Sequence, residues 1–235
     1  MNFYGKLYRF CRLVVRCFWP AYRVDRPERL NDPAIYVCRH FNSRGVFRTM
    51  PWLTGKIHPW AMHFYCDRDL CFKHLMSFTL TKRFHWRHWK ALFSAWLFSG
   101  FMPRLMHSAR AIPVYRNSMH VLQTYRLSVK ALIAGESLLI YADRDYTSED
   151  RSMGEMYEGF LALDRLYFRA GGRHISFITL YADNRTKELK VGESLAFVHD
   201  SPAKEERDFI YESIRAQLSG QPIPGQPSAP ASSHA

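Results

Sequence analysis

The chain has 235 residues, of which 47% are apolar and 15% aromatic, and a chain of this length buries roughly 70–75% of its unfolded surface. These proportions exclude a disordered chain and a small disulfide-stabilised domain. Lys and Arg number 33 against 21 Asp and Glu, a net charge of +12. The excess lies entirely in residues 1–120, so we expect an anionic partner: nucleic acid, anionic lipid or a phosphorylated small molecule.

The five cysteines are an odd number, and the start of the chain lacks the apolar run and cleavage site of a signal peptide. These features predict reduced thiols in the cytoplasm. The best apolar stretch, Ala91 to Met102, is closed by Lys90 and Pro103. It is shorter than the roughly 18 residues that a membrane span needs, so we expect no spanning helix.

Residues 1–19 are predicted to form a basic amphipathic helix. One face carries Phe3, Leu7, Phe10, Val14 and Phe18, and the other carries Lys6, Arg9, Arg12 and Arg16. Such a helix either lies on an anionic membrane surface or packs on the core with a solvated basic face. The segment from Trp89 to Phe98 is apolar nearly all round, so it is either a core helix or one that partly enters lipid. It favours the membrane hypothesis, which places the protein on the cytoplasmic face of a membrane.

Downstream of Pro20, short apolar runs alternate with helical patterns. Buried strands are predicted at Ala34–Cys38, Trp60–Tyr65, Ala111–Tyr115, Ser137–Tyr141 and His174–Tyr181. Helices are predicted at 118–135, 154–170 and 203–218, with a hairpin at 187–198 that turns at Gly192. Strands separated by helices predict an α/β fold with a largely parallel mixed sheet. The expected organisation is a helix at 1–19, an α/β domain at 20–219 and a disordered tail at 220–235.

Polar side chains follow three of these predicted strands. The first is followed by Arg39, His40 and Arg44, the third by Arg116, and the fourth by Asp143, Arg144, Asp145 and Tyr146. Because ligands of open α/β sheets bind beyond the carboxyl ends of the strands, we expect these side chains to converge on one edge.

The order of these blocks resembles that of the glycerolipid acyltransferases, the family of lysophosphatidic acid (1-acylglycerol-3-phosphate) acyltransferases, over about residues 20–200. That family has an Asn-His-x4-Asp block, an Ile-x-Ile-Asp-Arg-like block, a Phe-Pro-Glu-Gly-Thr-Arg block and a Pro-Val-containing strand. The similar segments here are Arg39-His40-x4-Gly45, Ile112–Arg116, Tyr141–Tyr146 and Ile175–Thr179. His40 and Arg116 match in type, and Asp143 keeps the charge of the family's Glu. Gly45 stands in place of the family's Asp, and Arg144 and Tyr146 replace the Gly and final Arg of the third block.

The resemblance implies a glycerol-3-phosphate acyltransferase-like fold that transfers an acyl chain from acyl-CoA or acyl carrier protein to a lysophospholipid hydroxyl, with no cofactor. His40 would act as the general base. Gly45 cannot orient an imidazole, so the orienting group would be Asp143, Asp145, Ser43 or a backbone carbonyl. The phosphate of the acceptor would bind Arg116, in a pocket enlarged by Arg39, Arg44, Arg144 and Tyr146. We interpret Gly45 itself as a position that needs a positive φ.

Three other hypotheses remain open. The missing Asp favours a relative that binds lipid without turnover. The basic excess and the stretch Lys82–Trp89 suit nucleic-acid binding, although no nucleic-acid motif accompanies them. Four potential zinc ligands, His63, Cys66, Cys71 and His74, lie close in sequence, but their spacing does not match zinc pairs, so no metal is expected. A hydrophobic tunnel beside His40 would favour acyl transfer, and an open basic groove would favour nucleic acid.

Overall fold

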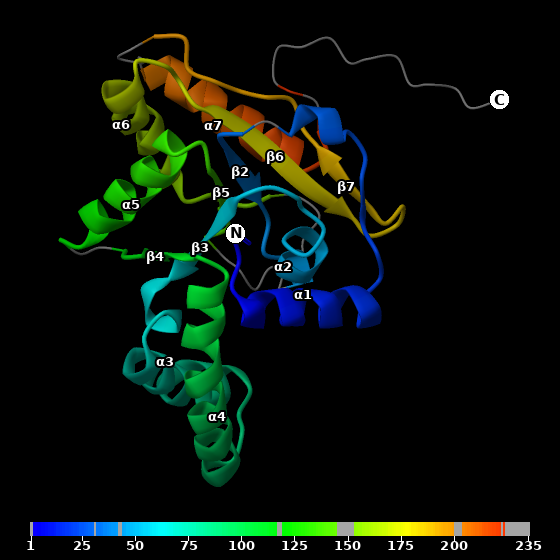
Figure 1. The fold of residues 1–235 in the computed structure, drawn as a ribbon, viewed down its shortest axis with the longest axis vertical. Coiled ribbons are helices and arrows are strands. Elements are labelled where there is room, and N and C mark those ends of the chain that lie inside the picture. The colour runs from blue at the N-terminus through cyan, green and yellow to red at the C-terminus, as the bar shows by residue number, and fades with distance from the viewer. Residues whose placement is uncertain are drawn as a thin grey trace. The chain divides into compact units, whose positions relative to one another are not determined.

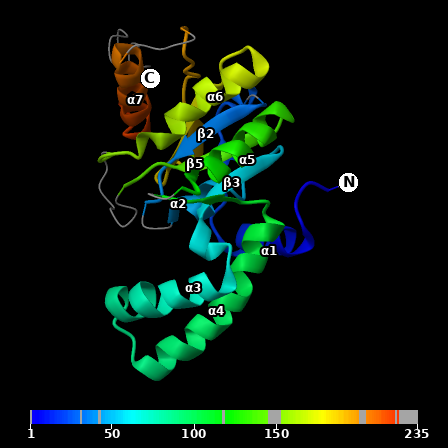
Figure 2. The same cartoon turned by 90° about the vertical axis from the view of Figure 1, so that its left-hand side faces the viewer.

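The computed structural model describes residues 2–30, 32–41, 44–116, 119–144, 153–199, 204–221 and 223, whose helices and strands are shown in Figures 1 and 2. They form two compact units. Unit 1 consists of residues 1–20 and 54–139, and unit 2 of residues 21–53 and 140–235. Both units are discontinuous in sequence, and the last of the three junctions between them, at residues 139 and 140, lies inside a strand. The predicted tail at 220–235 lies almost entirely outside the described residues.

Unit 1 contains a parallel set of strands. Strand β3 (Ile57–Met62) pairs in parallel with β4 (Ile112–Val114) and with the first residues of β5 (Ser137–Tyr141). The helical elements of this unit are α1 (Lys6–Phe18), η2 (His63–Tyr65), α3 (Arg68–His74), η3 (Leu75–Arg83), α4 (His88–Ser108) and α5 (Val121–Ile133).

Unit 2 contains the mixed part of the strand set. Strand β2 (Ala34–Cys38) runs parallel to β6 (Ser176–Asp183), and β6 is antiparallel to β7 (Glu188–Val191). The short strand β1 (Arg23–Val24) is parallel to β7, and β5 continues into this unit. The helical elements are η1 (Pro27–Arg29), α2 (Arg44–Thr49), η4 (Glu158–Leu161), α6 (Ala162–Gly171) and α7 (Lys204–Leu218).

The predicted α/β class with a mostly parallel mixed sheet is confirmed, since hydrogen bonding orders the strands β1-β7-β6-β2-β5-β3-β4. The bounds of β2 and β5 match the prediction to the residue, because both are fully buried apolar runs. The other strands are shifted by up to three residues. The end predicted for β3 is wrong, because residues 63–65 form a 3-10 turn.

Two other local predictions are wrong. The helix predicted from Gly154 begins only at η4, because residue 156 forms a β-bridge with Asp143. The hairpin predicted at 187–198 is instead the β6–β7 pair, which turns at residues 184–187. Asp183 Oδ1 accepts the main-chain N–H of Arg185 at 2.8 Å and so stabilises the turn.

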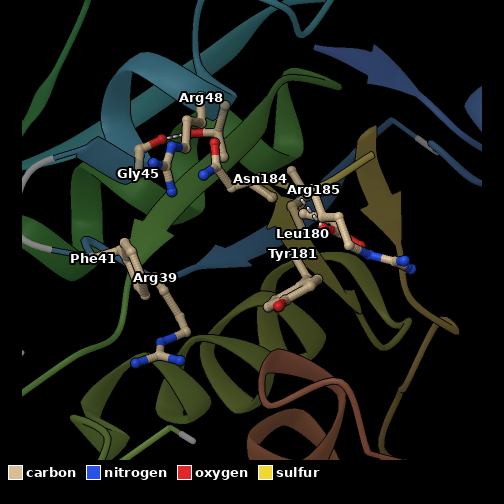
Figure 3. A pocket seen from close by; sticks show the side chains of 11 residues that line it. Arg39, Phe41, Gly45, Arg48, Leu180, Tyr181, Asn184 and Arg185 are labelled. Carbon is tan, nitrogen blue, oxygen red and sulfur yellow. Dashed lines mark hydrogen bonds between the residues drawn. The ribbon is translucent and has the colours of Figure 1, made fainter. Parts of the chain in front are cut away.

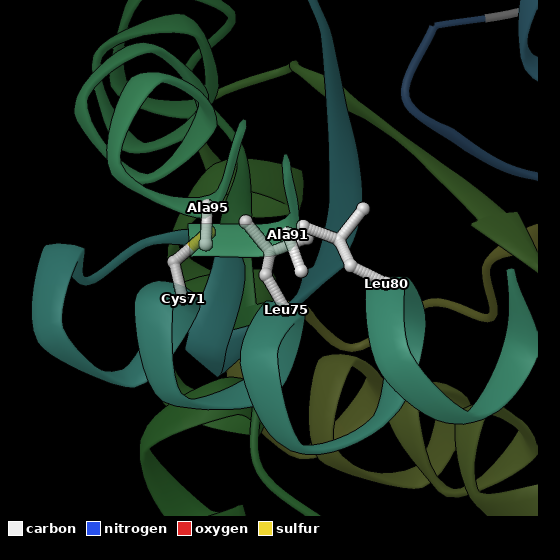
Figure 4. Packing of buried hydrophobic residues seen from close by; sticks show 5 residues of the cluster. All are labelled: Cys71, Leu75, Leu80, Ala91 and Ala95. Carbon is white, nitrogen blue, oxygen red and sulfur yellow. The ribbon is translucent and has the colours of Figure 1, made fainter. Parts of the chain in front are cut away.

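The chain segments α3, η3 and α4 of unit 1 pack around a small apolar cluster. The cluster consists of Cys71, Leu75, Leu80, Ala91 and Ala95 (Figure 4). Burial raises the pKa of the Cys66 and Cys71 thiols to about 11, so both stay protonated at neutral pH. Within the described ranges, no three His, Cys, Asp or Glu side chains are grouped to hold a metal ion.

Helix α4 buries its small side chains and exposes its large ones. The buried positions recur every four residues, at Ala91, Ala95, Ser99 and Pro103. The opposite surface exposes Trp89, Leu92, Phe93, Trp96, Leu97, Phe98 and Phe101. The alternative of an ordinary core helix is therefore wrong, because a core helix buries its large apolar side chains. None of the helices described is both long and apolar enough to span a membrane.

Helix α1 is fixed to the rest of unit 1 by main-chain and hydroxyl hydrogen bonds. The N–H of Gly5 donates to the carbonyl oxygen of Ser108 at 2.8 Å. The N–H of Tyr8 donates to the Ser108 hydroxyl, also at 2.8 Å, and the Tyr4 hydroxyl donates to the Ile57 carbonyl at 2.9 Å. The N-terminal helix is therefore an integral part of unit 1.

Candidate functional site

The candidate site lies in unit 2, where the chain leaves β2 and enters α2. The N–H of Gly45 donates to the His40 carbonyl oxygen at 2.7 Å, and the N–H of Arg44 donates to the Phe41 carbonyl oxygen at 3.1 Å. Phe41 has a φ of 45°, which is unusual for an aromatic residue. These contacts make a tight turn that fixes His40 at the carboxyl end of β2.

Gly45 is required by close packing of the backbone. A Cβ at this position would lie 1.9 Å from the Arg39 carbonyl oxygen and 2.7 Å from that of His40. Gly45 is the second residue of α2 and is not among the glycines with positive φ. The interpretation as a positive-φ glycine is therefore wrong, and the physical reason is the approach of the first turn of α2 to the end of β2.

Gly45→Ala is expected to destabilise the protein by about 3 kcal/mol, because backbone atoms must move to admit the methyl group. For a chain of this size that lowers the melting temperature by roughly 6–12 °C in a thermal unfolding scan. In an unstrained helix the same change would stabilise by about 0.5–1 kcal/mol, so the sign of the shift is diagnostic. The control is Gly154→Ala, where nothing lies within 4 Å of the added Cβ and the melting temperature should stay within about 2 °C. Equal stability of the two variants would contradict the packing argument.

His40 is held by both its main chain and its ring. Its main-chain N–H donates to Asp143 Oδ2 at 2.6 Å, and its imidazole packs on the Tyr141 ring with centroids 4.7 Å apart. The Thr49 hydroxyl donates to the Gly45 carbonyl at 2.9 Å, so the Tyr141 hydroxyl, 2.7 Å away, donates to Thr49. This chain of contacts fixes the surface on which the imidazole rests.

Asp143 reaches His40 through the main chain in this structure. The carboxylate is only 6% exposed, and its Oδ1 lies 3.7 Å from Arg39 Nε. Burial raises the pKa of the Asp143 carboxyl, although the His40 N–H and the positive charge of Arg39 oppose the rise. Asp143 is therefore placed as a support for the β2–α2 turn, beside the residue predicted to be the general base.

Cys38, two residues before His40, is excluded as a nucleophile. Its side chain is fully buried, and burial, together with the nearby negative charge of Asp143, raises the pKa of its thiol well above the ordinary range. A thiol in this state carries almost no thiolate at neutral pH, and the thiolate is the reactive form. The reactive candidate at this edge is the imidazole of His40.

The remaining predicted residues are dispersed. Arg44 begins α2 and is exposed, and exposed Arg144 pairs with Glu155 at 2.5 Å. Arg116 is an exposed residue of unit 1, two residues after the end of β4. Ser43, Asp145 and Tyr146 lie outside the described residues. The structure thus brings Arg39, His40 and Asp143 together, all within unit 2.

A pocket of about 530 Å³ opens beside this turn. One side is made by Arg39, Phe41, Gly45, Arg48 and Thr49, and the other by residues 180–185, at the carboxyl end of β6 (Figure 3). The lining combines guanidinium groups with the rings of Phe41 and Tyr181. The guanidinium groups suit an anionic group, and the rings suit an apolar part of the same ligand.

Residues Arg48 and 181–185 are absent from the sequence-based list of site residues. Residues 182–185 follow the predicted fifth strand, so the rule applied to the other strand ends would have found them. Arg48 lies three residues after Gly45, which places both on the same face of a helix. The spacing of Gly45 and Arg48 predicts a buried Arg48 only if Gly45 is already known to face the backbone of β2.

Comparison of the chain with protein-family models, with curated proteins and with solved structures finds no match. The function must therefore be argued from the site.

Proposed function

We propose that the protein is a membrane-surface acyltransferase that moves an acyl chain from a thioester to the hydroxyl of a phosphorylated glycerolipid. The proposal depends on one observation. His40, Asp143 and Arg39 lie together in unit 2, just beyond the carboxyl ends of the neighbouring strands β2 and β5. An imidazole supplies a base at neutral pH, and a guanidinium attracts the phosphate of the acceptor. The resemblance of the motifs around these residues to glycerolipid acyltransferases supports the choice of donor and acceptor.

In the proposed step, His40 accepts the proton of the acceptor hydroxyl as the hydroxyl oxygen attacks the thioester carbonyl carbon. A C–O bond forms, the C–S bond breaks, and the imidazolium returns its proton to the departing thiolate. The products are an oxygen ester and a free thiol. Asp143, acting through the His40 main chain, is a positioning residue in this scheme.

The exposed apolar surface of unit 1 supports a location on a membrane. On α4, Trp89 is 67% exposed and Phe93 is 64% exposed, and on α1 Phe18 is 86% exposed. Lys6 and Arg9 of α1 are also exposed. Aromatic side chains beside basic ones are typical of surfaces that insert into the headgroup region of anionic lipid.

A second candidate is a protein of the same kind that binds lipid without turnover. One observation favours it: the Asp143 carboxylate already accepts the His40 main-chain N–H, and Gly45 has no carboxyl group to orient the imidazole. Loss of the carboxylate that orients the base in a comparable triad lowers the rate by roughly 10⁴-fold. The two candidates differ only in whether product forms.

The experiment that separates them is an acyl-transfer assay with the full chain on anionic vesicles. A labelled acyl-CoA and a labelled acyl carrier protein serve as donors, and a panel of lysophospholipids serves as acceptors. Labelled two-chain phospholipid, formed with release of one free thiol per ester, is the expected result. Vesicle binding without product from either donor would contradict acyl transfer and favour the binding protein.

A further inference from the structure

The pocket of unit 2 contains a buried charge that the described part of the chain does not neutralise. Arg48 is 8% exposed, and its Nε has no hydrogen-bond partner among the described residues. Its guanidinium carbon lies 5.3 Å from the centre of the Phe41 ring. No carboxylate of the described residues forms an ion pair with it. Burying a guanidinium without a paired anion costs free energy, so an anionic ligand bound to Arg48 would stabilise the buried charge.

A second guanidinium meets the same aromatic ring. The Arg39 guanidinium carbon lies 5.7 Å from the centre of the Phe41 ring, so one ring restrains both cations. Phe41 holds this position with a φ of 45°. A strained backbone that persists at a pocket wall is typical of functional sites. The turn therefore fixes two positive charges beside one cavity.

Asp183, a carboxylate in the pocket lining, already binds other groups of the chain. Asp183 accepts the Arg185 N–H through Oδ1, and its Oδ2 pairs with Lys190 Nζ at 3.2 Å. Arg185 is exposed at the edge of the pocket and adds a third positive charge. Burial raises the pKa of the nearby Tyr22 phenol. The positive charge of Arg48 and a hydrogen bond between the two side chains oppose that rise, and the negative charge of Asp183 adds to it. The lining as a whole is therefore cationic.

We infer that this pocket binds the phosphate group of a small organic molecule, with Arg48 as its principal contact. The planar guanidinium matches two oxygens of a phosphate at once. A phosphate fills only a small part of the 530 Å³ cavity, so the organic part lies against Phe41 and Tyr181. If the proposed function holds, that phosphate belongs either to a glycerolipid headgroup or to the nucleotide of a thioester donor. The inference does not depend on acyl transfer, because binding is measured without turnover.

The test is calorimetric titration of the full chain, at constant ionic strength, with glycerol 3-phosphate and with adenosine 3′,5′-bisphosphate. We expect saturable binding of at least one probe, weakened at least tenfold in Arg48→Gln and less in Arg48→Lys, which keeps the charge. The control is Arg207→Gln, which removes an exposed charge from α7 of the same unit and should bind as wild type does. Tighter binding of glycerol 3-phosphate assigns the site to a lipid headgroup, and tighter binding of the bisphosphate assigns it to a nucleotide.

Failure of wild type to bind either probe overturns the inference. So does an equal loss in Arg48→Gln and Arg207→Gln, which would show attraction by overall charge alone. Circular dichroism and thermal unfolding verify that Arg48→Gln is folded. If it is not folded, a thermal-shift measurement on wild type and Arg48→Lys replaces it. The tighter-binding probe must raise the melting temperature of wild type above its value in NaCl of the same ionic strength. It must raise the melting temperature of Arg48→Lys by a smaller amount. Equal shifts in these two proteins overturn the inference.

Discussion

His40→Ala is expected to lower the rate of acyl transfer by about 10²–10⁴-fold, the contribution of a positioned general base. The loss should lie in kcat, with the KM of the acceptor nearly unchanged, because the imidazole acts on the proton that moves in the transition state. The measurement is initial rate against lysophospholipid concentration on vesicles. A rate within threefold of wild type would exclude His40 as the base.

Two further variants make this result specific. His199→Ala removes an exposed histidine of the same unit and is expected to transfer acyl chains at the wild-type rate. Asp143→Asn keeps an oxygen that can accept the His40 main-chain N–H, so a loss of less than about tenfold is expected if Asp143 acts by positioning. A loss as large as that of His40→Ala would instead assign the Asp143 charge a direct part in the reaction. Circular dichroism and thermal unfolding of each variant separate these cases from simple unfolding.

Substituting Phe93→Glu together with Trp96→Glu is expected to weaken binding to anionic vesicles at least 100-fold. Removing one large apolar side chain from water contributes about 1.5–3 kcal/mol, so the pair contributes roughly 3 kcal/mol or more, and the new carboxylates are repelled by anionic lipid. The measurement is co-sedimentation with vesicles of phosphatidylcholine and phosphatidylglycerol. High salt should weaken wild-type binding as well, because it screens the basic residues of α1.

The matched control is the double variant Met119→Glu with Leu122→Glu. These side chains are 88% and 67% exposed and belong to the segment at α5, outside the surface formed by α1 and α4. It should keep wild-type binding, and equal losses in both double variants would contradict a defined membrane surface. Deleting residues 1–19 is a poorer test, because α1 shares hydrogen bonds with Ser108 and Ile57.

The α/β class and the strands β2 and β5 could be predicted because apolar runs of five residues fit only a buried strand in this context. The β6–β7 pair was mispredicted because Gly192 resembled a turn glycine. In the structure its N–H donates to the Thr179 carbonyl, and a Cβ there would lie 2.0 Å from the Thr179 hydroxyl. A glycine needed for close approach has the same sequence signal as a glycine needed for a turn.

Part of the candidate site could be predicted from the positions of polar residues at the ends of the predicted strands. Arg39, His40 and Asp143 follow strand ends, and the topology brings them together. The role of Asp143 was not predictable, since the sequence does not distinguish a carboxylate that meets an imidazole from one that accepts a main-chain N–H. Arg48 was missed because a single Arg in a six-residue helix gives no sign that its side chain is buried.

The two sides of the pocket are made at very different times during synthesis. Arg39 and Arg48 leave the ribosome early, whereas residues 180–185 follow only after all of the unit 1 segment 54–139. At about 5–20 residues per second the delay is roughly ten seconds. Through that interval β2 has no β6 to pair with, and the later pairing of the two strands must close a loop of more than half the chain. Long-range pairing of this kind is slow, so the pocket is among the last parts of unit 2 to form.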